Sequence, residues 1–95
     1  MDGVRVGRWL PARARKAIAM RDATTQQELD TLGAAIRAAR KERGFTQEGF
    51  AAHAGIDRSY FGAIERGEFN ITIGTLTTIA AGLGVPAWAL LKRGR

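Results

Sequence analysis

The chain has 95 residues, enough for one small domain, and 45% of them are apolar, which fits a folded protein with a modest core. It carries 15 Lys and Arg against 9 Asp and Glu, and this net charge of +6 favours a polyanionic partner, either nucleic acid or an anionic membrane surface. Cysteine is absent, which excludes disulfides and thiolate metal sites, and no apolar run approaches the roughly 18 residues that a membrane span requires.

The positive charge is concentrated at the two ends of the chain. Residues 1–28 hold six Lys and Arg against three Asp and Glu, and residues 93–95 form a basic tail with two more. Residues 29–92 hold seven against six and are nearly neutral. Any basic face on the central domain therefore has to come from the arrangement of its side chains rather than from an excess of charge.

The N-terminal extension, residues 1–24, has little apolar periodicity. We expect a basic arm that is flexible or contains a short helix over residues 12–20. Pro11 suits the first position of such a helix, where its missing N–H is not needed. Met20 is an alternative translation start.

A folded domain is expected over residues 25–92, and its first core helix should begin at a capping box. In this motif the Thr25 hydroxyl and the Glu28 carboxylate satisfy each other's backbone donors. An apolar stripe at three- and four-residue spacing follows, made of Leu29, Leu32, Ile36 and Ala39. The helix is predicted to end at Arg43, with Gly44 supplying the positive φ that closes it.

Two short helices follow, each with a cap residue at its start and a glycine at its end. Thr46 is the predicted N-cap of the first, which ends at Gly55. Asp57 is the predicted N-cap of the second, which spans residues 58–65 and is terminated by Gly67.

The last two predicted helices complete an all-α bundle of five helices. Thr72 caps the fourth helix and Gly84 stops it. Its expected inner face consists of Ile73, Leu76, Ile79, Ala80 and Leu83. Pro86, after Val85, starts a fifth helix that carries Trp88, Leu90 and Leu91.

The link between the second and third helices predicts a helix-turn-helix. A connection as tight as residues 54–56 cannot reverse the chain, so the two helices must meet at a steep angle. Such a turn needs a glycine, here Gly55, and a small residue where the helices cross, here Ala51. It also needs inward apolar anchors on the following helix, and these are Ile56, Phe61 and Ile64.

These residues resemble the Cro/phage-repressor type of helix-turn-helix domain. The matching runs are Thr46-Gln47-Glu48, Phe50-Ala51, Ala54-Gly55-Ile56 and Ile64-Glu65-Arg66-Gly67, continued by Leu76, Ile79-Ala80, Leu83 and Val85. The resemblance covers residues 29–92 and implies a five-helix fold like that of lambda repressor. Within the family, Asp57-Arg58-Ser59-Tyr60, Asn70 and Thr72 are most similar to controller proteins of restriction–modification systems and to small bacterial repressors.

The resemblance implies a sequence-specific regulator of transcription whose recognition helix, residues 57–66, enters the major groove of double-stranded DNA. The candidate DNA-binding residues are Thr46, Gln47, Asp57, Arg58, Ser59, Tyr60, Gly62, Ala63, Arg66 and Asn70.

Their expected roles differ. Arg58 is the best base reader, because a guanidinium can donate two hydrogen bonds to guanine, although a phosphate contact is the alternative. We expect Ser59, Gly62 and Ala63 on the outward face. Tyr60, Arg66 and Asn70 should meet phosphates, with half-buried packing as the alternative for Tyr60. Gln47 should reach a phosphate from a helix N-terminus or pack on a base-reading neighbour, with a solvated amide as the alternative.

A dimer on a palindromic operator is expected, because one recognition helix reads only a few base pairs. Trp88, Leu90 and Leu91 are candidate dimer contacts, since they offer more apolar surface than one small core requires. The alternative for these residues is completion of the core.

Two further sets of residues have structural interpretations. The resemblance implies an internal ion pair between Arg40 and Glu65 that ties the first core helix to the recognition helix. His53 should be ordinary surface, because no other ligand stands at metal-binding spacing from it.

An antitoxin is the alternative function, with the basic arm bound to a protein toxin and the helix-turn-helix regulating its own promoter. Loss of a tightly bound partner on truncation at Met20 would favour it. An enzyme is not expected, since there is no paired-carboxylate, nucleophile–histidine or phosphate-loop pattern. No cofactor or metal is implied. We expect a bacterial cytoplasmic protein that is nucleoid-associated when bound to DNA.

Overall fold

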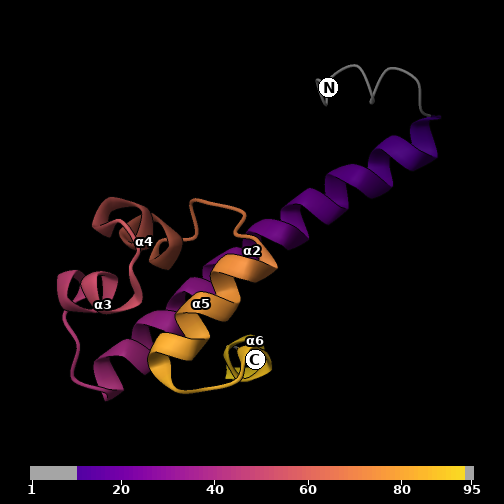
Figure 1. Ribbon diagram of the computed structural model, residues 1–95. Coiled ribbons are helices and arrows are strands. Elements are labelled where there is room, and N and C mark those ends of the chain that lie inside the picture. The colour runs from indigo at the N-terminus through magenta and orange to yellow at the C-terminus, as the bar shows by residue number, and fades with distance from the viewer. Residues whose placement is uncertain (1–10, 94–95) are drawn as a thin grey trace.

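The computed structural model describes residues 11–93, with backbone only for residues 12–24 and for Arg93. Over that range the chain is entirely helical and has no strand, so the prediction of an all-α fold is confirmed (Figure 1). The five helices are α2 (Ala12–Glu42), α3 (Gln47–Ala54), α4 (Arg58–Glu65), α5 (Ile73–Leu83) and α6 (Ala87–Arg93).

α2 is one continuous helix of 31 residues, which differs from the prediction. Pro11 is its N-cap, so neither a separate helix over residues 12–20 nor a capping box at Thr25 is present. The physical reason is that no proline and only one glycine interrupts a stretch rich in Ala, Arg, Lys, Gln and Glu, all good helix formers. The predicted border between arm and domain therefore falls inside a helix.

The N-terminal part of α2 extends beyond the other helices (Figure 1). The division into an arm, residues 1–24, and a domain, residues 25–92, stays a prediction. Residues 1–10 of the predicted arm and residues 94–95 of the predicted tail lie outside the described range.

The predicted starts of α3, α4 and α5 are confirmed by their caps. Each cap side chain accepts a hydrogen bond from the backbone N–H three residues further on: Thr46 from Gly49 at 2.9 Å, Asp57 from Tyr60 at 3.0 Å and Thr72 from Thr75 at 3.0 Å. Gly55, in the turn between α3 and α4, has a φ of 73°, which few other residues adopt without strain.

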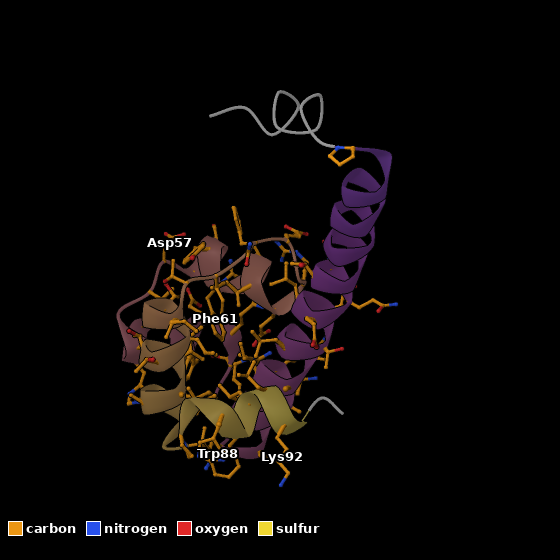
Figure 2. All side chains as sticks on the ribbon, turned by 90° about the vertical axis from the view of Figure 1, so that its right-hand side faces the viewer. Asp57, Phe61, Trp88 and Lys92 are labelled. Atoms are coloured by element: carbon orange, nitrogen blue, oxygen red, sulfur yellow. The ribbon has the colours of Figure 1, made fainter. Side chains whose placement is uncertain are left out.

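The core lies where α2, α3, α4, α5 and α6 meet. The largest fully buried side chains are Phe50, Phe61, Ile36, Ile79, Leu83 and Leu90. Phe61 points into the middle of the bundle, and its ring centroid lies 5.0 Å from that of Phe50 (Figure 2). Ile73, predicted on the inner face, is instead 75% exposed, because the first turn of α5 lies at the edge of the core.

A close helix crossing fixes the position of α4. A Cβ placed on Gly33 of α2 would lie 2.5 Å from the Glu65 carbonyl oxygen and 2.7 Å from that of Ile64. Only a glycine lets the backbone of α2 approach the end of α4 this closely. Two turns earlier on α2, the Gln26 side-chain amide donates to the Gly67 carbonyl at 3.0 Å. α4 is thus held against α2 at its C-terminal end and leaves its N-terminal end at the surface.

Candidate functional site

The exposed part of α4 is its N-terminal turn. Asp57, Arg58 and Ser59 are exposed, Tyr60 is half-buried, and the four residues after Tyr60 are buried. Asp57 lies at one end of the bundle, and Trp88 and Lys92 lie at the opposite end (Figure 2). Of the predicted base-reading residues, Arg58 and Ser59 therefore occupy the accessible position that the prediction required.

Gly62 and Ala63 do not lie on an outward face, so that prediction is wrong. A Cβ at Gly62 would meet Gln47 Oε1 and Arg66 Nη1, each at 3.2 Å, so two side chains cover this position. Ala63 is only 4% exposed. Neither residue presents accessible surface to a ligand on this geometry.

A buried hydrogen-bonded network ties α2, α3 and α4 together. Arg40 Nε donates to Glu65 Oε2 at 2.7 Å and Arg40 Nη2 donates to Glu65 Oε1 at 3.2 Å, while the two side chains are only 8% and 3% exposed. Arg40 Nη1 donates to the Phe45 carbonyl at 2.8 Å. The ion pair is present as predicted, and its two charges satisfy each other where water is excluded.

Gln47 belongs to the same network, which the sequence did not indicate. Its Nε2 donates to Glu65 Oε1 at 3.0 Å, so its amide is neither freely solvated nor directed only at a ligand. Thr46, next to it, is exposed and caps α3. The network sets the angle between α3 and α4 and therefore the direction of the exposed turn.

Arg66 and Glu68 form a second ion pair, at the surface beyond α4. Arg66 Nε donates to Glu68 Oε2 at 2.8 Å, and the side chains are 58% and 54% exposed. The hydrogen bond from Arg66 holds the pKa of the Glu68 carboxyl below its usual value, and the same bond raises the pKa of Arg66. Glu68 thus partly offsets the positive charge of Arg66 in the free protein.

Two aromatic contacts were missed by the sequence reasoning. Tyr60 meets Phe69 edge-on, with ring centroids 5.4 Å apart, and Phe69 is 49% exposed. His53 is exposed, as predicted, yet its ring stacks on Phe45 at 5.0 Å and its Nε2 lies 3.2 Å from the Gly82 carbonyl oxygen. The contact between His53 and Gly82 joins α3 to α5, and the spacing of these residues along the chain does not predict it.

The three candidate dimer residues on α6 separate into two groups. Leu90 is fully buried in the core, so it has no surface for a second copy and its prediction as a dimer contact is wrong. Trp88 is 63% exposed, with Lys92 Nζ 5.9 Å from its ring centroid, and Leu91 is 48% exposed. The core alternative therefore applies to Leu90 alone.

A largely apolar groove of about 400 Å³ adjoins α6. Leu91 lines it on one side and Leu29 of α2 on another, and Ile71 and Ile73 contribute from the start of α5 and the segment before it. Three of the four large exposed apolar side chains of the described residues, Ile73, Trp88 and Leu91, thus belong to this groove or to α6.

Two kinds of site are absent from the described part of the chain. Among residues 25–92, whose side chains the structure describes, no group of three or more His, Cys, Asp or Glu side chains is placed to hold a metal ion. Within residues 11–93 no helix is both long enough and apolar enough to cross a bilayer.

The chain is similar in sequence and in fold to known helix-turn-helix proteins. The family model for Helix-turn-helix matches residues 36–87. The chain is 41% identical over 56 residues to a hypothetical transcription factor of Neisseria meningitidis, covering 59% of this chain and 53% of that protein. It is 41% identical over 54 residues to the control protein C.MunI of Mycoplasma, covering 56% of this chain and 73% of that one.

A solved structure extends the comparison to the fold. The restriction–modification controller protein C.Esp1396I, a tetramer in complex with its natural 35-base-pair operator, matches with a TM-score of 0.64 and 34% identity, covering 70% of this chain and 92% of that one. The chain spans about half the length of the Neisseria relative. The matched segment includes α3, the glycine turn and α4, and the chain belongs to the helix-turn-helix family of the Cro/C1 type.

Proposed function

We propose that the protein is a sequence-specific regulator of transcription that binds double-stranded DNA as a dimer on a palindromic operator. The observation that carries this proposal is the exposed first turn of α4, with Arg58 and Ser59 at the surface. The buried ion pair between Arg40 and Glu65 fixes α4 against α2. A rigid helix with an exposed N-terminal turn suits insertion into the major groove. A binding role, rather than a catalytic one, is part of the proposal.

The positions of other charged and polar side chains support a phosphate contact on either side of α4. Thr46 is exposed at the start of α3, where backbone N–H groups favour an anion. Arg66 and Asn70 are exposed after the end of α4. In this proposal they fix the register of the protein on the duplex, while Arg58 discriminates between bases.

The proposed dimer uses the exposed face of α6, Trp88 and Leu91, together with the adjoining apolar groove. Because Asp57 and Trp88 lie at opposite ends of the bundle, a dimer built on α6 leaves both copies of the α4 turn exposed (Figure 2). A two-fold interface requires a patch that is complementary to itself, and this one offers both a projecting indole and a groove.

Selection of bound duplexes from a random pool, using the full-length chain, tests the DNA-binding part. We expect an inverted repeat with two half-sites about one helical turn apart, or a multiple of that distance. Recovery of unrelated sequences would contradict sequence-specific binding.

Sedimentation at micromolar concentration tests the dimer. The wild-type chain should sediment as a dimer and the variant Trp88→Ser/Leu91→Ser as a monomer. The matched control is Thr77→Ser/Thr78→Ser, which changes two exposed side chains on α5 and should leave the dimer intact. A wild-type monomer, both alone and on the selected duplex, would refute the palindrome.

A second candidate function, an antitoxin, is favoured by one observation. α2 begins at Ala12, well before residue 36, where the family match begins, and C.Esp1396I covers 70% of this chain, so the N-terminal part of α2 is additional to the shared domain. Truncation at Met20 should release a co-encoded protein partner if the chain is an antitoxin. If the chain is only a regulator, copurification with neighbouring gene products should be the same before and after truncation.

A further inference from the structure

We propose that Phe69 is a positioning residue for Tyr60, and that it holds the Tyr60 ring so that its hydroxyl meets DNA at one fixed place. This inference rests on the proposed function, since it assigns a role within the DNA-binding surface. The two rings meet edge-on, with centroids 5.4 Å apart and an interplanar angle of 63°. This is the geometry that aromatic rings prefer, because the positive edge of one faces the negative face of the other.

The Tyr60 hydroxyl has the freedom that such a role requires. Among the described residues it makes no hydrogen bond, while the Tyr60 backbone N–H donates to Asp57 Oδ2 at 3.0 Å. Tyr60 is half-buried, so part of its side chain stays accessible to solvent. Tyr60 directly follows the exposed Arg58 and Ser59, so it belongs to the same N-terminal turn of α4 as the candidate base-reading residues.

Phe69 is itself held in place, which lets it orient a neighbour. Its segment is anchored before it by the Glu68 backbone N–H, which donates to the Ala63 carbonyl at 3.0 Å. After it, Ile71 packs against the core and Thr72 caps α5. A half-exposed phenyl ring at a surface that binds a polyanion has no charge to offer DNA, and its aromatic partner among the described residues is Tyr60.

The expected benefit is entropic. A tyrosine ring that is already fixed loses less conformational freedom when its hydroxyl binds, and such a side chain contributes a factor of about threefold to tenfold in affinity. The contribution should appear only if the hydroxyl makes its contact. The effect of Phe69 should therefore depend on the presence of that hydroxyl.

A double-mutant cycle on the full-length chain tests the dependence. The probes are the duplex selected by the wild-type chain and an unrelated duplex of equal length. Phe69→Ala and Tyr60→Phe should each weaken binding to the selected duplex by about threefold to tenfold, and the double variant should be no weaker than Tyr60→Phe alone. Phe69→Leu, which keeps apolar bulk without a ring, should behave like Phe69→Ala, whereas Phe69→Trp should restore affinity.

Thermal melts of all variants keep the test independent of folding, because the affinities are measured well below the lowest melting temperature. Additive losses in the double variant would overturn the inference, since Phe69 would then act through the loop or by touching DNA itself. If the wild-type chain binds its selected duplex and both single variants bind it with unchanged affinity, the inference would also be overturned. Failure of the wild-type chain to bind any duplex would instead refute the proposed function on which the inference rests.

Discussion

Replacement of Arg40 by methionine should destabilise the protein severely. The variant removes the charge but keeps most of the apolar stem, so it isolates the electrostatic part of the interaction. Glu65, whose side chain is only 3% exposed, would lose its partner charge and both hydrogen bonds from Arg40. The Phe45 carbonyl would lose the third hydrogen bond that Arg40 donates.

Breaking a buried ion pair in this way costs about 3–5 kcal/mol. A domain of this size has a free energy of unfolding of about 5–15 kcal/mol, so the loss is a large fraction of the total. With a urea dependence of about 1–3 kcal/mol per molar, the urea midpoint should fall by more than 1 M. The assay is urea unfolding followed by circular dichroism.

The surface pair provides a matched control. Arg66 and Glu68 have the same donor and acceptor atoms at 2.8 Å instead of 2.7 Å, but both side chains are more than half exposed. Arg66→Met should therefore cost no more than about 1 kcal/mol. The double variant Arg40→Met/Glu65→Leu should recover much of the stability, because it leaves no unpaired buried charge. If Arg40→Met cost no more than Arg66→Met, the reasoning from burial would be refuted.

Further predictions concern the helix crossing, a cap and the surface pair. Gly33→Ala should lower the free energy of unfolding, measured in urea, by about 1–3 kcal/mol, because its Cβ would meet the backbone of α4. The control Gly74→Ala has room for a Cβ and should be neutral or stabilising. Equal effects of the two substitutions would contradict the close crossing. Thr72→Ala should cost about 1 kcal/mol in the same assay through loss of the α5 cap, and an unchanged midpoint would contradict that role. Glu68→Gln should free Arg66 to contact a phosphate, so the salt dependence of DNA binding, measured by fluorescence anisotropy, should steepen by about one ion. An unchanged slope would show that Arg66 does not contact the duplex.

Local signals predicted most of the fold because they act within a few residues. Cap residues such as Thr46 and Asp57 and the positive-φ glycine at 55 leave a direct mark on the sequence. The exception is the start of the first core helix. Thr25 and Glu28 have the spacing of a capping box, but the same spacing occurs inside helices. Nothing in the preceding residues breaks the helix, so α2 continues back to Ala12.

The errors in the candidate site arise from contacts between distant segments. The period of α4 alone puts Gly62 outward, yet side chains from α3 and from the end of α4 cover it. In the same way, Leu90 and Leu91 are neighbours in sequence, and only the packing of α6 decides that one is buried and the other exposed. The contact between Tyr60 and Phe69 joins two segments across a turn, which no spacing rule predicts.

The central claim is that the exposed turn of α4 reads base sequence, and Arg58→Ala tests it most directly. Affinity should be measured for the selected duplex and for an unrelated duplex of equal length, with Arg37→Ala, an exposed change of the same charge on α2, as the control. Arg58→Ala should weaken binding to the selected duplex by about fivefold to 150-fold and binding to the unrelated duplex much less, while Arg37→Ala keeps the ratio of the two affinities. Equal losses on both duplexes would contradict the claim, because Arg58 would then contact only the DNA backbone.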